Sequence, residues 1–420
     1  MFDLSAIQAA IGEFGFDGWL LYDFRGSNVL ARRILGLDLD HAGSRRFFYW
    51  IPAQGTPHKL VHRIEDSALD SLPGERTIFL KWQELEEGVR RCVEGRQKVA
   101  MEYSPRNGNP YVSKVDAGVV ELVRSFGPDV VSSGDLVQLF EATWDDEQWA
   151  MHQEAAVHTN SAYDVAWEFI ADRVRKENHV SEEAVRDRIM GHFRANSLTT
   201  YSPPIVARGP HSGLPHYETG AGDDTLIRAE DFVLIDLWAK LDKPRAVYSD
   251  LTRTGFVGER VPEQFTKIFN IVAAARDEGI ETVEQAFRSK TPIRGYEVDN
   301  AVRRVIEDAG YGKFFAHRTG HSIGQEVHGN GANIDGLETK DERMLLPRTC
   351  FSIEPGIYLP EFGVRSEVDV FIDASGQVHV TGGERQKEIV PILMQYPEGR
   401  AKKEPAPRKK KGPTTKGRAS

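Results

Sequence analysis

Short apolar runs and amphipathic segments alternate along the first third of the chain. Apolar runs typical of buried strands lie at residues 18–23, 47–52, 59–62, 77–80, 99–103 and 129–132. Amphipathic segments predict helices at about 3–15, 83–94 and 112–126. Because strands alternate with helices, the pattern indicates an α/β domain, which we expect to cover residues 1–144.

The pattern changes after residue 144 to long helices and antiparallel hairpins. A long helix is predicted at 145–179, and Ser181 with the two glutamates after it is a good start for another helix. Strands at 231–239 and 246–257 are expected to form a hairpin. Long helices are predicted after the hairpin, at about 262–289 and 296–310. We therefore expect a second domain of the α+β class, covering residues 145–396.

The stretch from residue 317 to residue 369 concentrates the residues that can carry chemistry. A Gly-His-x-x-Gly turn contains His321, and His328 follows seven residues later. The apolar run Cys-Phe-Ser-Ile then ends in Glu354 and is stopped by a Pro-Gly pair. A carboxylate at the end of an apolar strand is costly to desolvate unless a cation meets it.

A strand predicted at 363–370 adds a second carboxylate to this stretch. Side chains alternate across a strand, so Arg365, Glu367 and Asp369 are expected on one face. Glu354, Glu367 and His321 can then converge on one concave site. A divalent cation, or the guanidinium of Arg365, would compensate the two carboxylates.

The hairpin supplies two further acids. Asp236 interrupts the apolar core of the first strand, and Asp250 does the same in the second, fourteen residues later. The hairpin can bring the two side chains together, where unpaired carboxylates would repel each other and raise a pKa. Two bridged metal ions would remove that repulsion.

Five residues therefore make up the candidate metal site, and four of them are acids: Asp236, Asp250, His321, Glu354 and Glu367. An oxygen-rich set without thiolates suits a site for Mn²⁺, Co²⁺, Fe²⁺ or Zn²⁺ that carries out chemistry. It does not resemble a structural zinc site, in which cysteine dominates. Two such ions could hold a bridging water or hydroxide and hydrolyse an amide or ester. Taken singly, each residue also fits a structural role, such as a strand-end acid or a turn-capping histidine; the ordered set favours the metal site.

Composition narrows the class of protein. The chain has 420 residues, 40% of them hydrophobic and 28% charged, with only two cysteines. The cysteine count excludes a disulfide-rich scaffold and fits a reducing cytoplasm. No apolar run reaches membrane-spanning length, and the first residues do not resemble a secretory signal, so we expect a cytoplasmic protein with no membrane partner.

Charge is distributed unevenly along the chain. The net charge is −10, yet residues 401–420 hold eight Lys or Arg against one Glu. An acidic body argues against nucleic acid as the main partner. The basic tail, 397–420, is expected to be disordered, and a solubilising role is favoured over contact with nucleic acid or an anionic surface.

Four sequence words together resemble the pita-bread metallopeptidases, which include prolidase, aminopeptidase P and methionine aminopeptidase. They are SDLTRT, HRTGHSIGQEVH, SIEPGIY and VRSEVDV. The resemblance implies a pita-bread catalytic domain at 145–396 behind a creatinase-like N-terminal domain at 1–144. The sequence departs from the family pattern at Trp238, which stands where glycine is usual, and after His328, where Gly-Asn-Gly follows.

The resemblance also implies roles for individual residues. It places metal ligands at Asp236, Asp250, His321, Glu354 and Glu367, with Glu354 also acting as general base and acid. It assigns His216 and His328 to the scissile carbonyl or the substrate, and Arg365 to a partner of the ligands. The family arginine that binds a dipeptide carboxylate has two candidates nearby, Lys340 and Arg343.

The function implied is hydrolysis of Xaa-Pro bonds in short peptides by a prolidase-type dipeptidase with two divalent ions, Mn²⁺ by preference. An aminopeptidase P-type Xaa-Pro aminopeptidase is the alternative. A metal-free peptide-binding module, or a creatinase-like C–N hydrolase on the same fold, is a further alternative that the intact ligand set disfavours. The resemblance also implies a homodimer.

Overall fold

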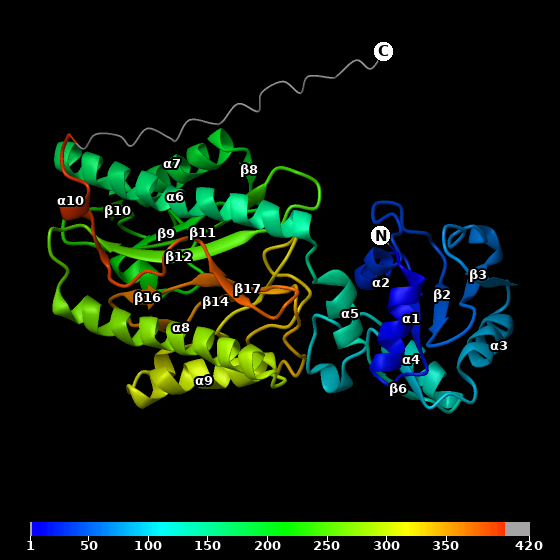
Figure 1. Cartoon of the computed structure of the whole chain (residues 1–420). Coiled ribbons are helices and arrows are strands. Elements are labelled where there is room, and N and C mark those ends of the chain that lie inside the picture. The colour runs from blue at the N-terminus through cyan, green and yellow to red at the C-terminus, as the bar shows by residue number, and fades with distance from the viewer. Residues whose placement is uncertain (1, 400–420) are drawn as a thin grey trace, which may run out of the picture.

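The computed structural model describes residues 2–399, so the predicted basic tail falls almost wholly outside the described residues. Figure 1 shows two lobes side by side, with the N-terminal residues in the smaller lobe on the right and the later helices and strands on the left. Among the described residues, no helix is both long enough and apolar enough to cross a membrane.

The N-terminal lobe is built on a six-stranded mixed sheet in the order β4-β3-β2-β1-β5-β6. Its strands are β1 (Gly18–Asp23), β2 (Phe47–Pro52), β3 (His58–His62), β4 (Glu75–Phe79), β5 (Lys98–Met101) and β6 (Asp129–Ser132). Both faces are buried, because Trp19 and Leu21 enter one apolar cluster while Leu20 and Tyr22 enter another. The predicted α/β pattern of alternating elements is confirmed.

Helices cover both faces of this sheet. Two match sequence expectations closely, namely α1 (Leu4–Glu13) and α3 (Trp82–Val93). The helix predicted at 112–126 is α4 (Ala117–Ser125), which begins five residues later because Asp116 caps it. Two others, α2 (Val29–Ile34) and α5 (Gly134–Glu141), were not predicted. At α2, where only turn residues were expected, Asn28 accepts a hydrogen bond from the Ala31 N–H and so caps a helix too short to show a period.

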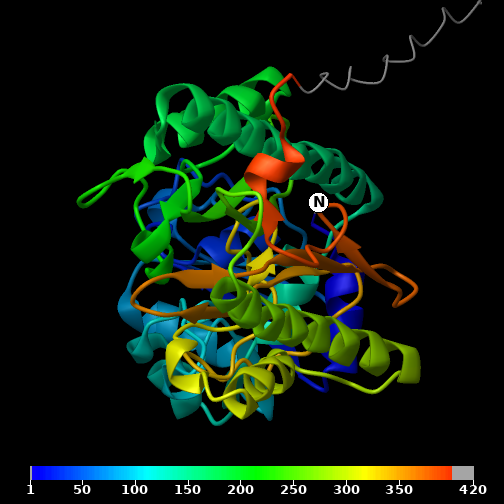
Figure 2. The same cartoon turned by 90° about the vertical axis from the view of Figure 1, so that its left-hand side faces the viewer.

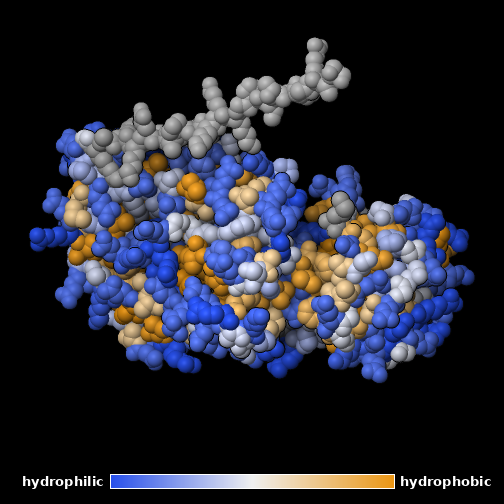
Figure 3. Space-filling view, in the orientation of Figure 1, coloured by the Kyte–Doolittle hydropathy of each residue, from blue (hydrophilic) through white to orange (hydrophobic). Residues whose placement is uncertain are grey.

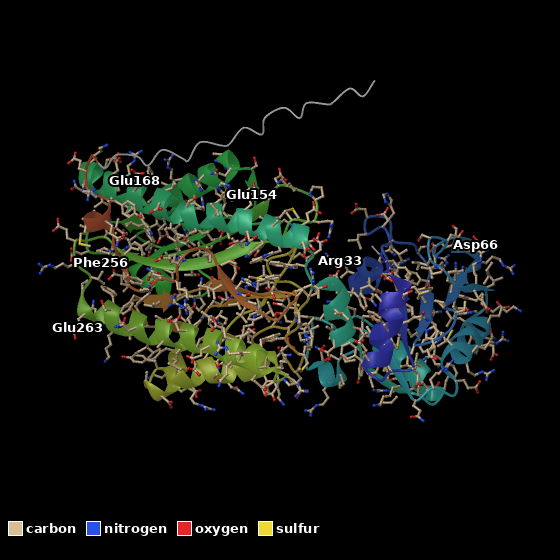
Figure 4. All side chains as sticks on the ribbon, viewed as in Figure 1. Arg33, Asp66, Glu154, Glu168, Phe256 and Glu263 are labelled. Atoms are coloured by element: carbon tan, nitrogen blue, oxygen red, sulfur yellow. The ribbon has the colours of Figure 1, made fainter. Side chains whose placement is uncertain are left out.

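The larger lobe has strands between two pairs of helices. Figure 2 shows α6 (Asp146–Glu177) and α7 (Glu182–Ala195) on one side, and α8 (Glu263–Ser289) and α9 (Gly295–Asp308) on the other. In Figure 4, Phe256 lies between these layers, Glu154 and Glu168 lie on α6, and Glu263 begins α8. The four predicted long helices are confirmed to within two residues at each end. Asp145 and Gln148 form a capping box that begins α6.

Two sheets carry the residues that matter for function. The first has β11 (Phe232–Leu241) and β12 (Ser249–Phe256) at its centre, flanked by β8 (Leu198–Thr199), β9 (Ile205–Arg208) and β19 (Val390–Pro391). The second contains β13 (Ser322–Ile323), β14 (Cys350–Ile353), β17 (Val368–Ile372) and β18 (Val378–Thr381). A small ladder of β15 (Gly356–Tyr358) and β16 (Gly363–Arg365) lies apart, as does the pair β7 (Val180–Ser181) and β10 (Leu226–Ile227).

Alternation along β11 determines what each of its faces does. Val233, Ile235 and Leu237 enter the apolar cluster under α6 and α7. Phe232 and Leu234 face the opposite cluster, which includes α8 and α9. The next residues on that second face are Asp236 and Trp238, which line a cavity instead of the apolar core. The same regular strand therefore contributes first to the core and then to the candidate site.

The prediction of a single strand at 363–370 is wrong. The chain forms β16 up to Arg365 and resumes as β17 at Val368, and the two strands pair with different partners. Between them, Ser366 Oγ accepts a hydrogen bond from the buried Arg276 of α8 at 2.7 Å, and the Glu367 N–H donates to the Thr252 carbonyl at 3.3 Å. These contacts bend the chain, so a pattern of alternating residues does not guarantee one continuous ladder.

Helix α5 joins the two lobes. The Gln138 amide donates to the Met344 carbonyl at 2.7 Å and accepts from the Ala332 N–H at 2.6 Å. Arg33, labelled at the junction in Figure 4, forms ion pairs with Glu141 of its own lobe and with Glu326 of the other. Figure 3 shows hydrophobic residues along the line where the lobes meet on this face.

Replacing Gln138 by alanine should destabilise the junction. The substitution leaves the Ala332 N–H and the Met344 carbonyl without their partner, at a cost of about 2 kcal/mol. We expect a lower midpoint in urea unfolding and faster amide hydrogen exchange at residues 330–345. Gln153→Ala on the exposed face of α6 is the matched control; equal stability of the two variants would contradict this role.

Candidate metal centre

Five separate segments bring the expected ligands to one cavity of about 180 Å³. Asp236 comes from β11 and Asp250 from β12, while His321 directly precedes β13. Glu354 directly follows β14, and Glu367 lies between β16 and β17. The cavity is also lined by three other residues singled out in the sequence: His216, His328 and Arg365.

The hairpin register places the two aspartates on one face. Asp236 lies opposite Thr252, and Trp238 lies opposite Asp250. Directly opposed residues of an antiparallel pair project to the same side, so both aspartates face the cavity. Both are buried, and among the described residues neither Asp236 Oδ1 nor Asp250 Oδ1 has a hydrogen-bond partner. Buried carboxylate oxygens without partners are what a metal ligand set presents when its ion is left out.

His321 is oriented toward the acids. Its Nδ1 lies 3.1 Å from the Ser322 carbonyl oxygen, which leaves Nε2 at 3.5 Å from Asp250 Oδ2 and 3.4 Å from Glu354 Oε1. One ligand atom each from Asp250, His321 and Glu367 lie within 4.8 Å of one another. A backbone acceptor on the far ring nitrogen is the arrangement that orients many metal-binding histidines.

Burial dominates the electrostatics of the cluster. It raises the pKa of Asp236, Asp250 and Glu367, and that of Glu354 to about 7, and the neighbouring carboxylates raise the last three further. Burial also lowers the pKa of His321 well below its ordinary value, so its imidazole is neutral and able to bind a cation. Four acids and a neutral imidazole fit a pair of divalent cations.

Arg365 is the guanidinium that contacts these acids. It forms an ion pair with Asp236, and its Nε lies 3.8 Å from Glu354 Oε2. The same side chain donates to Thr252 Oγ1 at 3.1 Å and to the Tyr358 hydroxyl at 3.0 Å. The donors of Arg365 are therefore taken by protein groups that line or surround the cavity.

The two histidines expected near the substrate both line the cavity. The ring of His328 lies edge-on to that of His321, with centroids 4.3 Å apart. Desolvation of its ring by the cavity wall, together with the nearby charge of Arg318, lowers the pKa of His328 to about 4, so this ring is neutral near pH 7. His216 lies in an exposed loop before Tyr217 and reaches the same cavity.

The structure does not bring Lys340 or Arg343 to this cavity. Lys340 is exposed and pairs with Glu342 at 2.7 Å, and Arg343 is buried against Asp341 at 2.6 Å. Both line a different cavity, which faces the N-terminal lobe. A lysine or arginine can be close in sequence to a ligand and still point away from it.

Arg318 is a cation that lines this cavity although the sequence motifs did not single it out. Its Nη1 donates to the Tyr111 hydroxyl of the N-terminal lobe at 2.6 Å. Within residues 2–399, no carboxylate lies in ion-pair distance of its guanidinium. Its position three residues before His321, inside HRTGH, was the available signal.

Comparison with known proteins agrees with this fold. The sequence profile of metallopeptidase family M24 matches residues 150–374, more than half of the chain, and the chain belongs to this family. It is 35% identical over 183 residues to a Xaa-Pro dipeptidase of Pyrococcus furiosus, covering 43% of this chain and 48% of that protein. It is 34% identical over 213 residues to the uncharacterised peptidase YqhT of Bacillus subtilis, covering 50% of this chain and 56% of that protein. The chain thus spans about half the length of these curated relatives.

Solved structures extend the similarity to both lobes. Dipeptidase PepE from Mycobacterium ulcerans superposes with a TM-score of 0.65 at 22% identity, covering 92% of this chain and 96% of that chain. A dipeptidase from Pyrococcus horikoshii superposes with a TM-score of 0.58 at 24% identity, covering 92% of this chain and 99% of that chain. The predicted pita-bread fold with its α/β N-terminal part is confirmed.

The metal-free protein should become less stable as pH rises. The pKa of Glu354 is about 7 in the folded state against an ordinary 4.5, so the unfolded chain loses this proton first. Stability therefore falls between about pH 4.5 and 7, by about 3 kcal/mol from this group, and then levels off. Added MnCl₂ should reverse the loss, because a cation binds the deprotonated ligands.

Thermal melting of the chelator-treated protein at pH 5, 6 and 7 measures this effect, with Glu354→Gln as the matched variant. The variant has no proton to lose at this position and should show a shallower dependence on pH. Identical pH profiles for the two proteins would refute the assignment of the slope to Glu354.

Proposed function

We propose that this protein is a metal-dependent peptidase that hydrolyses Xaa-Pro bonds, with dipeptides as its main substrates. The observation that carries the proposal is the convergence on one cavity of five candidate ligand side chains, which are spread over more than 100 residues of the chain. Two carboxylate oxygens there lack any partner among the described residues. The Xaa-Pro dipeptidase of Pyrococcus furiosus supports the substrate class by similarity.

Two divalent ions, which we propose to be Mn²⁺, would be held by the five residues of the candidate metal site: Asp236, Asp250, His321, Glu354 and Glu367. When bound, the ions supply Lewis acidity, which polarises a carbonyl and makes a water more acidic. Arg365 and Thr252 hold the ligands in place, since Thr252 Oγ1 donates to Glu367 Oε2 at 2.7 Å and accepts from Arg365 Nε.

Glu354 is suited to move a proton during the reaction. Burial raises its pKa to about 7, where a carboxyl group can both accept and return a proton near neutral pH. Ser352 Oγ donates to its Oε1 at 3.2 Å and orients the group. The carboxylate would take a proton from the attacking water and deliver it to the proline nitrogen, which needs one to leave as an amine.

His216 and His328, which both line the cavity, would bind the scissile carbonyl. A neutral imidazole can donate a hydrogen bond to the carbonyl oxygen as negative charge builds there, and such donors lower the barrier most when they are already in position. Desolvation of the ring and the charge of Arg318 favour the neutral state of His328, because they lower its pKa to about 4.

Arg318 supports the preference for dipeptides over longer peptides. Its guanidinium lines the cavity and has no acidic partner within residues 2–399, so it can bind the free carboxylate of a proline residue. A cavity of about 180 Å³ also suits a small substrate.

The resemblance to the prolidases further supports a homodimer. The two cysteines, which are free and buried, fit a cytoplasmic protein.

Replacing the carboxylate of Glu354 or of Asp250 by an amide should abolish catalysis. Manganese-loaded Glu354→Gln and Asp250→Asn are each expected to lower kcat/KM for Ala-Pro by about three orders of magnitude, because proton transfer or ligand charge is lost. Proline release is measured with a ninhydrin or chromatographic assay. Glu154→Gln, an exposed acid on the outer face of α6, is the matched control. Full turnover in either site variant would eliminate the proposal.

Arg318→Gln should separate dipeptides from amidated substrates. Loss of a charge-assisted hydrogen bond is worth about 1.5–3 kcal/mol, so KM for Ala-Pro should rise roughly ten- to a hundred-fold. KM for the amide Ala-Pro-NH₂, which has no carboxylate, should barely change. Arg304→Gln, an exposed arginine on α9, serves as the control.

The same assay decides between Arg318 and the earlier candidate Lys340. If Lys340→Gln raises KM for Ala-Pro while Arg318→Gln does not, the sequence-based assignment is right and the assignment to Arg318 is wrong. Equal activity of the wild-type protein on Ala-Pro and on longer Ala-Pro peptides would favour the aminopeptidase alternative.

A further inference from the structure

His216 belongs to a loop of residues 209–221, here called the histidine loop. The side chain lines the cavity but is exposed, and within residues 2–399 its ring makes no hydrogen bond to another group. A ring without such a bond is oriented by the backbone that carries it. The contacts that hold the histidine loop therefore determine where His216 lies at the cavity.

Glu182, the first residue of α7, binds this loop at several points. Its side chain is fully buried. Oε2 accepts a hydrogen bond at 2.6 Å from the hydroxyl of Tyr217, the residue directly after His216. Oε1 accepts from the Arg208 N–H at 2.8 Å and lies 2.8 Å from Nδ1 of His211. One carboxylate thus holds the chain just before the loop, near its start and directly after His216.

The buried charge of Glu182 depends on these same contacts. A carboxylate without water is costly unless hydrogen-bond donors surround it. Its donors come from the histidine loop and from the end of β9, and no lysine or arginine side chain of the described residues lies within ion-pair distance. The rings of His211 and Tyr217 also stack, with centroids 4.5 Å apart. Loop and carboxylate therefore stabilise each other.

The other side of the histidine loop packs on the ladder of β15 and β16. The Gly363 N–H donates to Ser212 Oγ at 2.9 Å. A Cβ atom on Gly213 would lie 2.4 Å from the Leu359 carbonyl oxygen, so only glycine fits this contact. The loop is thus held between Glu182 on one side and, on the other, the ladder that carries Arg365.

We propose that Glu182 is a positioning residue, which acts through Tyr217 to hold His216 where it meets the scissile carbonyl. This inference rests on the proposed hydrolysis of Xaa-Pro bonds and adds a residue on which that reaction depends. Glu182 does not line the cavity, so it does not touch the substrate. A donor already in position stabilises charge on the carbonyl oxygen as it develops. A loosened loop should therefore slow the chemical step more than it weakens substrate binding.

Tyr217→Phe tests this role, because it removes the hydroxyl that binds Glu182 and keeps the ring that stacks on His211. In the manganese-loaded protein, kcat for Ala-Pro should fall by about ten-fold, with KM changed by less than about three-fold. Tyr49→Phe is the matched control and should keep the wild-type kcat. Its ring is also buried, and its hydroxyl donates to the Pro73 carbonyl at 2.8 Å in the N-terminal lobe.

Two further comparisons separate positioning from general stability. In a His216→Ala background there is no ring to position, so Tyr217→Phe should change kcat by less than about two-fold. An equal loss in both backgrounds would overturn the inference. Glu182→Gln keeps an acceptor oxygen and should retain more of kcat than Glu182→Ala. If Glu182→Ala does not fold, the cycle with Tyr217→Phe decides the matter.

The ring of His216 also gives a readout that needs neither metal nor turnover. In the metal-free protein with isotope-labelled histidine, the ring NMR signal that disappears in His216→Gln identifies this residue. That signal should shift or broaden in Tyr217→Phe and stay in place in Tyr49→Phe. An unmoved signal in Tyr217→Phe would overturn the inference. Absence of wild-type turnover on every Xaa-Pro substrate would overturn the proposed function, while a moved signal would still support Glu182 as the group that holds the loop.

Discussion

Four carboxylates, of which Asp236, Asp250 and Glu367 are buried and Glu354 is half-buried, share one cavity with the guanidinium of Arg365, which contacts two of them. Such an arrangement is costly in a low-dielectric interior, because each acid is desolvated and the acids repel one another. The protein keeps them close by packing their strands into two apolar clusters, one on each side of β11 and β12. Stability of the fold and affinity for cations are therefore coupled: the core provides the energy that holds an otherwise repulsive set in place.

The contacts around the acids show how that coupling is distributed. Thr252 links Glu367 to Arg365, and Arg365 reaches Asp236. On the other side, the Asp250 N–H donates to both oxygens of the buried Asp369 at 3.2 and 3.1 Å. Asp236, Asp250 and Glu367 are thus each held by a group from another segment, and a shift of one segment would move several of the acids together. Rigid positioning of this kind is what a reaction centre requires.

The N-terminal lobe belongs to the same functional unit as the larger lobe. Gln138 and Glu141 of α5 bind backbone and side-chain groups of residues 330–344, in the segment that follows His328. Tyr111 meets Arg318 at the cavity itself. A change in lobe packing would therefore affect both Arg318, the proposed partner of the substrate carboxylate, and the loop that carries His328.

The sequence by itself determined the element types, most helix boundaries and the identity of the acids and imidazole of the site. These follow from local rules, since the direction of a side chain depends on the backbone of a few neighbouring residues. Tertiary structure alone decided which distant groups meet. It broke the chain at Ser366, it turned Lys340 and Arg343 away while bringing in Arg318, and it formed α5 where no period was visible. Arg365 and Asp236 are 129 residues apart, and only the packing of whole strands and helices places two such groups in contact.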